Sequence, residues 1–126
     1  HWEDANYLFS DSRWPNADQL YGYAAECGLK CLMLRFGMAF ESEGYPPRED
    51  RVHSNRLWPR YEAYRAGAGA AGYLLPRQNP FDNWHSSQRY ADGSTFSQAH
   101  VEAHRRGAKF VRGLINKAIL EGILVI

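Results

Sequence analysis

Cysteine, long hydrophobic runs and an excess of charge of one sign are all scarce in this chain of 126 residues. Two cysteines cannot form the disulfide framework of a small secreted domain. No apolar run approaches the roughly 20 residues that a helix needs to cross a bilayer, so we expect no membrane association. The formal net charge of +1 gives no overall field to recruit nucleic acid, so any such binding needs a local patch.

The two cysteines, Cys27 and Cys31, lie four residues apart in a segment that we expect to be helical. Their Cα atoms would be about 6 Å apart with parallel side chains, an unfavourable geometry for a disulfide. We interpret both as small buried hydrophobic residues of a protein in a reducing compartment, the cytoplasm. These cysteines have no second pair of ligands near them in the sequence at the spacing of a metal site, so we expect no metal and no other cofactor.

Alternation of apolar and polar residues with a period of two is also missing, and so are internal repeats. Apolar residues at helical spacing instead predict helices near residues 1–10, 15–38, 50–65 and 95–122. Pro15 suits the first turn of the second helix, whereas Pro59 must kink the third helix or begin a new segment of it. Thr95 and Gln98 form a capping-box pattern at the start of the last helix.

Residues 20–34 are the most informative segment, because they are apolar around almost the whole helix circumference. Glu26 and Lys30 are the only charged residues in it. Such a helix cannot lie on a surface and must be surrounded by other helices. We therefore predict one domain, residues 1–126, with an all-α fold: an up-and-down bundle of four to five helices.

Three short elements resemble the HEPN domain superfamily. They are Asp4-Ala5 with Leu8, then Ala17-x-x-Leu20-x-x-x-Ala24-x-Glu26-x-x-Leu29-Lys30, and finally Arg89-Tyr90 before the last helix. The resemblance extends over most of the chain. It implies a HEPN-like bundle that forms a homodimer and interacts with RNA or a nucleotide. It also implies a toxin–antitoxin or defence role, with a nucleotidyltransferase antitoxin as partner.

Many members of that family are metal-independent ribonucleases with an arginine and a histidine, four to six residues apart, near the start of the last long helix. The histidine exchanges a proton, and the arginine stabilises the charge on the phosphorane. The one literal match here, Arg48 and His53, precedes the third helix instead, and Arg89 is too far from His100. These four residues are the candidate catalytic groups, and the pattern leaves the enzyme assignment open.

The loop before the last helix is a candidate nucleotide site. Arg89 can bind a phosphate while Trp84 or Tyr90 stacks on a base. Alternatively, Arg89 caps carbonyl groups or pairs with Asp82 or Asp92, and so fixes the loop to the bundle.

The last helix carries two further candidate features. His100 and His104 are one turn apart, which is half of a metal site, but no third ligand is evident and simple burial or surface placement explains them better. Arg105, Lys109 and Arg112 form a basic stripe that can follow a phosphate backbone or be an ordinary solvated face.

Aromatic residues are numerous, with 4 Trp, 8 Tyr and 6 Phe. Most must fill the core or an interface between two copies, so we expect a homodimer. The alternative to an RNA-interacting module is therefore a non-catalytic helical dimer that acts as a protein-interaction subunit.

Overall fold

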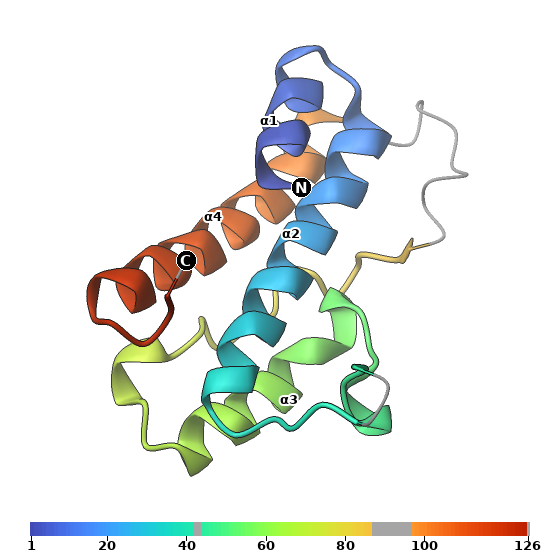
Figure 1. Cartoon of the computed structure of the whole chain (residues 1–126). Coiled ribbons are helices and arrows are strands. Elements are labelled where there is room, and N and C mark those ends of the chain that lie inside the picture. The colour runs from blue at the N-terminus through green and yellow to red at the C-terminus, as the bar shows by residue number, and fades with distance from the viewer. Residues whose placement is uncertain (42–43, 87–96, 126) are drawn as a thin grey trace.

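The computed structural model of the chain describes residues 1–41, 44–86 and 97–125 (Figure 1). In chain order its elements are α1 (Trp2–Ser10), α2 (Trp14–Arg35), the 3-10 turn η1 (Arg48–Asp50), α3 (Ser54–Gly67), the 3-10 turn η2 (Ala71–Tyr73) and α4 (Gln98–Leu120). The described residues contain no strand, which confirms the all-α fold class. Within those ranges no helix has the length and apolarity to cross a membrane.

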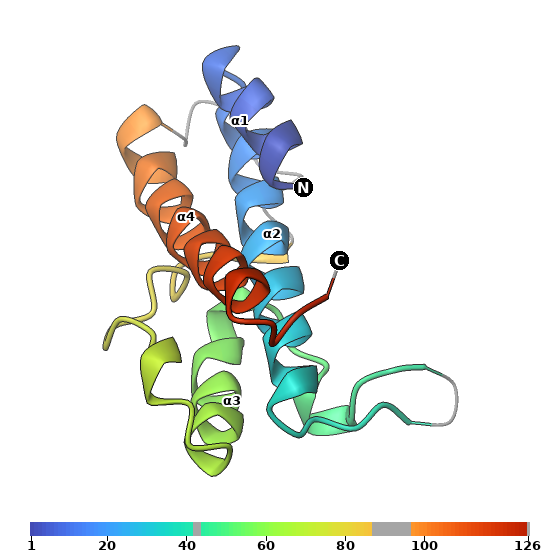
Figure 2. The same ribbon diagram turned by 60° about the vertical axis from the view of Figure 1, so that its left-hand side comes forward.

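α2 is the central helix, and α1, α3 and α4 all pack against it (Figures 1 and 2). The fully buried apolar residues of α2 are Ala17, Tyr21, Ala25, Leu29, Leu32 and Met33. The prediction that this apolar helix is surrounded by others is therefore confirmed.

The interpretation of Cys27 and Cys31 as buried residues is wrong, because both are exposed. They line a small groove of about 270 Å³ with residues of α4, where the neighbouring helices leave a strip of α2 uncovered. Desolvation and the adjacent Glu26 carboxylate raise the pKa of the Cys27 thiol, so this thiol is protonated near neutral pH.

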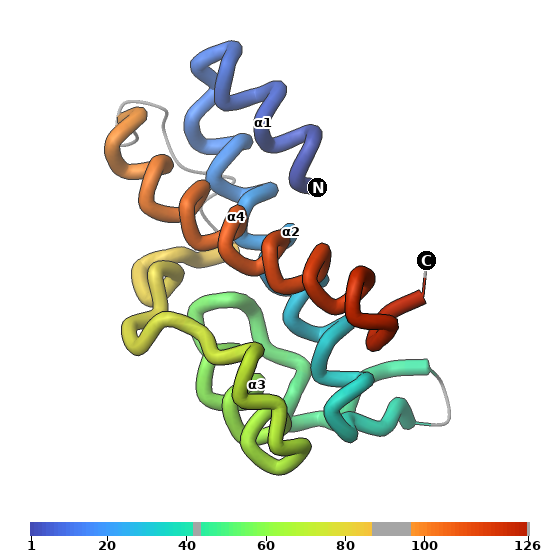
Figure 3. Tube along the Cα trace, turned by 90° about the vertical axis from the view of Figure 1, so that its left-hand side faces the viewer, coloured from blue at the N-terminus to red at the C-terminus, as the bar shows by residue number. Residues whose placement is uncertain are grey.

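The helices do not simply alternate in direction. α1 runs antiparallel to α2, because only residues 11–13 connect them. α4 runs in the same sense as α2: His104 contacts Asp18, and further along both helices Val111 lies against Gly28. α3 also follows the direction of α2 (Figures 1 and 3). An up-and-down order thus holds only for the first helix pair, because the long connections after α2 and α3 return the chain to the same end.

The helix ends follow local chemistry. α2 ends earlier than predicted, because Gly37 adopts a φ of +116° that a helix cannot contain. Ser97 is the N-cap of α4, and its hydroxyl oxygen accepts a hydrogen bond of 3.2 Å from the His100 backbone N–H. Thr95, the predicted cap, lies outside the described residues.

Pro59 lies inside α3 without dividing it. Proline has no N–H, so the carbonyl of Asn55, one turn earlier, loses its intrahelical donor. The side-chain amide of the buried Asn79 donates to this oxygen at 3.3 Å and to the Ser54 carbonyl at 2.9 Å. Asn79 therefore replaces the hydrogen bond that Pro59 removes.

Candidate functional site

The first candidate site lies between the beginnings of α2 and α4. Asp18 and His104 are both fully buried, and Asp18 Oδ1 lies 2.5 Å from His104 Nδ1. Asn83, from the segment after η2, places its Oδ1 2.7 Å from His104 Nε2. Oxygen atoms from two different segments therefore hold the imidazole of His104 on both sides.

His100 lies one turn before His104 and is half-buried. The two rings meet edge to face, with centroids 5.5 Å apart and an interplanar angle of 82°. One potential ligand atom from each of Asp18, His100 and His104 lies within 4.8 Å of the others. Asp18 is thus the acidic partner that the histidine pair lacked in the sequence, where it stands 86 residues from His104.

Two aromatic residues support this cluster. The indole Nε1 of Trp84 donates a hydrogen bond of 2.9 Å to the backbone carbonyl of Asp18. The ring of Phe81 stacks on His104, with centroids 5.3 Å apart and planes at 15°. Trp84 is fully buried, so it positions Asp18 and offers no face to a base, contrary to the nucleotide-stacking expectation.

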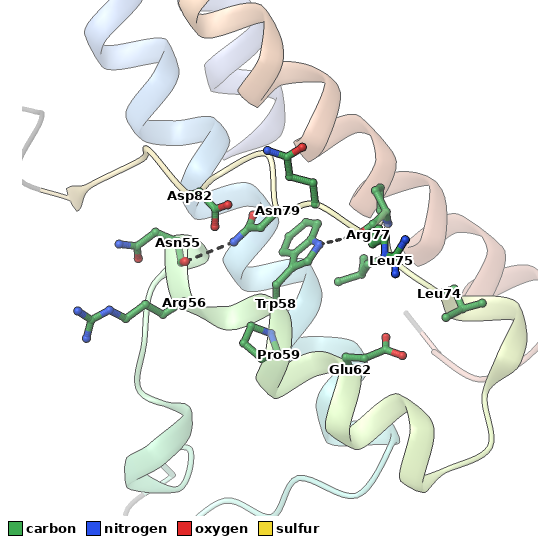
Figure 4. A pocket seen from close by; sticks show the side chains of 12 residues that line it. Asn55, Arg56, Trp58, Pro59, Glu62, Leu74, Leu75, Arg77, Asn79 and Asp82 are labelled. Carbon is green, nitrogen blue, oxygen red and sulfur yellow. Dashed lines mark hydrogen bonds between the residues drawn. The ribbon is translucent and has the colours of Figure 1, made fainter.

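The second candidate site is an open groove of about 1090 Å³ between α3 and the segment that follows η2 (Figure 4). Trp58, Pro59 and Leu75 give it apolar surface. Arg56 and Arg77 lie on opposite sides of the Trp58 indole (Figure 4). Both arginines are exposed, and within the described ranges neither forms an ion pair.

Two carboxylates also line this groove, those of Glu62 and Asp82. Glu62 already accepts hydrogen bonds from Nε and Nη2 of Arg65, one turn further along α3. Its charge is therefore offset by an arginine that is not part of the groove lining. The amides of Asn55 and Gln78 add neutral hydrogen-bonding groups to the groove lining.

The four predicted catalytic residues do not all lie at one site. Arg48 is exposed at the start of η1. His53 precedes α3, and in the described part of the chain its Nδ1 pairs with Glu26 Oε2 at 3.2 Å rather than with Arg48. His100 belongs to the cluster with Asp18. Arg89 lies outside the described residues, as does Tyr90 from the predicted binding loop.

The predicted basic stripe is only partly available to a ligand. Arg105 Nη1 lies 3.3 Å from Glu102 Oε1, and its guanidinium stands 5.1 Å from the centre of the Phe9 ring, so it is engaged within the fold. Lys109 and Arg112 are exposed on α4.

No family model, no curated protein and no solved structure matches this chain. The resemblance to HEPN proteins, with its implied ribonuclease activity, homodimer and antitoxin partner, therefore stays a prediction.

Proposed function

We propose that the chain is a HEPN-like RNA- or nucleotide-interacting module that binds its ligand in the groove beside α3. The observation that carries this proposal is the pair of exposed arginines, Arg56 and Arg77, which flank an apolar floor and form no ion pair with any residue that the structure describes. Guanidinium groups bind phosphate oxygens through paired, charge-assisted hydrogen bonds.

The remaining lining of the groove suits the rest of a nucleotide. The apolar surface of Pro59 and Leu75 can cover a base or a ribose, and the amides of Asn55 and Gln78 can donate to and accept from a base edge. The indole Nε1 of Trp58 donates to the Pro76 carbonyl at 3.0 Å, which fixes the floor before any ligand arrives. A preformed floor lowers the entropic cost of binding.

The salt dependence of binding follows from the number of arginines that line the groove. Two arginines neutralise at most two phosphates, and each phosphate of a single strand contributes about 0.7 to the slope of log K against log salt. We therefore expect a shallow slope of about −1.4 for single-stranded RNA. A much steeper slope would indicate a larger basic surface than this groove.

The test compares two variants that lose the same amount of charge. Arg56→Ala/Arg77→Ala removes both positive charges from the groove, whereas Lys109→Ala/Arg112→Ala removes the two exposed positive charges of the α4 stripe. With a fluorescently labelled single-stranded RNA and anisotropy as the readout, we expect the groove variant to bind at least about 10-fold more weakly, because two charge-assisted contacts are lost. The stripe variant should bind like the unaltered protein.

Three results would contradict the proposal. An equal loss in both variants would indicate general attraction to positive charge, and a loss in the stripe variant alone would place the RNA on α4. Absence of RNA binding by the unaltered chain would favour the alternative, a protein-interaction subunit. Cleavage of the same RNA, measured with and without His53→Ala, tests the predicted ribonuclease activity separately.

A further inference from the structure

We propose that Asp18, His100 and His104 form a binding site for one divalent transition-metal ion of the Zn²⁺ type. The three side chains come from α2 and α4, and their ligand atoms lie within 4.8 Å of one another. This proposal does not depend on the groove beside α3, because that groove is lined by other residues.

The chemical nature of the three ligand atoms determines which class of metal ion the site prefers. Two imidazole nitrogens and one carboxylate oxygen suit Zn²⁺ and its neighbours in the transition series, whereas Mg²⁺ and Ca²⁺ prefer oxygen ligands. Ligands at about 2.0–2.1 Å from a tetrahedral ion lie roughly 3.3 Å from one another. The Asp18–His104 contact of 2.5 Å must therefore open slightly, and His100 must move closer by a side-chain rotation.

The surroundings of the His104 ring suit a metal ion on Nδ1. Both ring nitrogens face oxygen atoms, Nδ1 toward Asp18 and Nε2 toward Asn83. A neutral imidazole has only one N–H and can donate to only one of them. When Nε2 carries that N–H, Nδ1 presents its lone pair toward Asp18, where a metal ion can bind between the two side chains. With a metal ion on Nδ1, the Nε2–H donates to Asn83, which is the usual outer-shell arrangement of a ligating histidine.

The third donor distinguishes a metal site from a simple ion pair. A hydrogen bond between Asp18 and His104 involves two residues, whereas a metal ion would also engage His100, whose ligand atom lies within 4.8 Å of theirs. Three protein ligands leave one position of a tetrahedral ion for water or substrate, as in catalytic zinc sites. Because His100 is half-buried, it lies on the side of the cluster nearer to solvent.

The cluster is held in place by groups that need no metal. Trp84 fixes the backbone of Asp18, and Phe81 stacks on the ring of His104. Ligands whose positions are already set lose little conformational entropy when an ion binds.

The experiment titrates chelator-treated protein with Zn²⁺ by calorimetry and with Co²⁺ by visible absorption, which reports a four-coordinate site. We expect one ion per chain. His100→Ala and Asp18→Asn should each lower the Zn²⁺ affinity at least about 100-fold, beyond the 10–100-fold typical of outer-shell groups. Asn83→Ala, at an exposed outer-shell position, should lower it about 10-fold.

The control variant, His1→Ala/His53→Ala, removes two histidines outside the cluster and should keep the full affinity. His100 is half-buried, so His100→Ala is expected to fold, as circular dichroism can verify, and it keeps the test valid if Asp18→Asn does not fold. The proposal is overturned if the unaltered protein binds no ion at this stoichiometry, if His100→Ala binds as tightly as the unaltered protein, or if the control variant loses the ion. The first of these outcomes would leave Asp18 and His104 as a buried hydrogen-bonded pair that binds no metal.

Discussion

Replacing Gly22 with alanine tests how the Trp84 indole is held against α2. A Cβ atom at Gly22 would lie 2.0 Å from Trp84 Cε2 and 2.3 Å from its Nε1, far inside any van der Waals contact. The indole has no room to retreat, because it is fully buried and its Nε1 is bonded to the Asp18 carbonyl. The substitution must therefore displace the indole or the helix.

The expected magnitude follows from two opposing effects. Alanine favours a helix over glycine by about 1 kcal/mol. Two contributions destabilise the variant. Overpacking costs about 1–3 kcal/mol, and displacing the indole costs part of the roughly 3–5 kcal/mol that removal of a buried tryptophan side chain costs. We expect the free energy of unfolding to fall by about 2–4 kcal/mol, which lowers the Tm by about 7–14 °C for a chain of this length.

Gly113→Ala is the matched control, because this glycine also lies in a helix, α4, and its Cβ would meet open space. The higher helix propensity of alanine compared with glycine should by itself make this variant more stable by up to about 1 kcal/mol. Urea denaturation followed by circular dichroism measures both variants. In a Trp84→Leu background, Gly22→Ala should cost much less, because the clashing atoms are gone. Equal stability of the two alanine variants would refute the placement of Trp84 across α2.

Three further perturbations address other parts of the fold, each measured by urea denaturation. Asn79→Ala should lower the free energy of unfolding by about 1–3 kcal/mol, because the Asn55 carbonyl loses the donor that replaces the missing N–H of Pro59, and by less in a Pro59→Ala background. Asp50→Asn should lower it by about 1–3 kcal/mol, because this buried carboxylate accepts two hydrogen bonds of 2.6 Å; an unchanged value would contradict that role. Burial and the hydrogen bond to Glu121 raise the pKa of Tyr73 to about 12, whereas an unfolded tyrosine ionises near about pH 10. Stability should therefore fall as the pH rises from about 10 to 12, and Tyr73→Phe should reduce this fall.

Much of the helical architecture could be predicted, because it depends on neighbours in the sequence. The apolar periodicity located all four helices, and the nearly unbroken apolar surface of residues 20–34 identified the helix that the others surround. The predictions of burial failed where packing against a distant segment determines whether a side chain is covered. Cys27 and Cys31 belong to that apolar surface, yet none of the helices that the structure describes covers their strip of α2.

The candidate sites were predictable only in part. His100 and His104 were visible as a pair, because a spacing of four places both on one helix face. Their acidic partner was not visible, since Asp18 belongs to a different helix and nothing in its neighbourhood marks it as a ligand. The groove beside α3 was missed for a similar reason: Arg56 and Arg77 belong to separate segments that carry no shared motif.

The amino-acid order by itself determined which segments are helical, which of them must be central and which residues stand on a common helix face, because these depend on backbone hydrogen bonding and on burial along one segment. Only the tertiary structure decided that α4 lies alongside α2 in the same direction, which brings His104 to Asp18 across 86 residues. That outcome depends on how two helix surfaces fit, including the close approach of Val111 on α4 to Gly28 on α2, and such a fit is a property of pairs of segments rather than of either one.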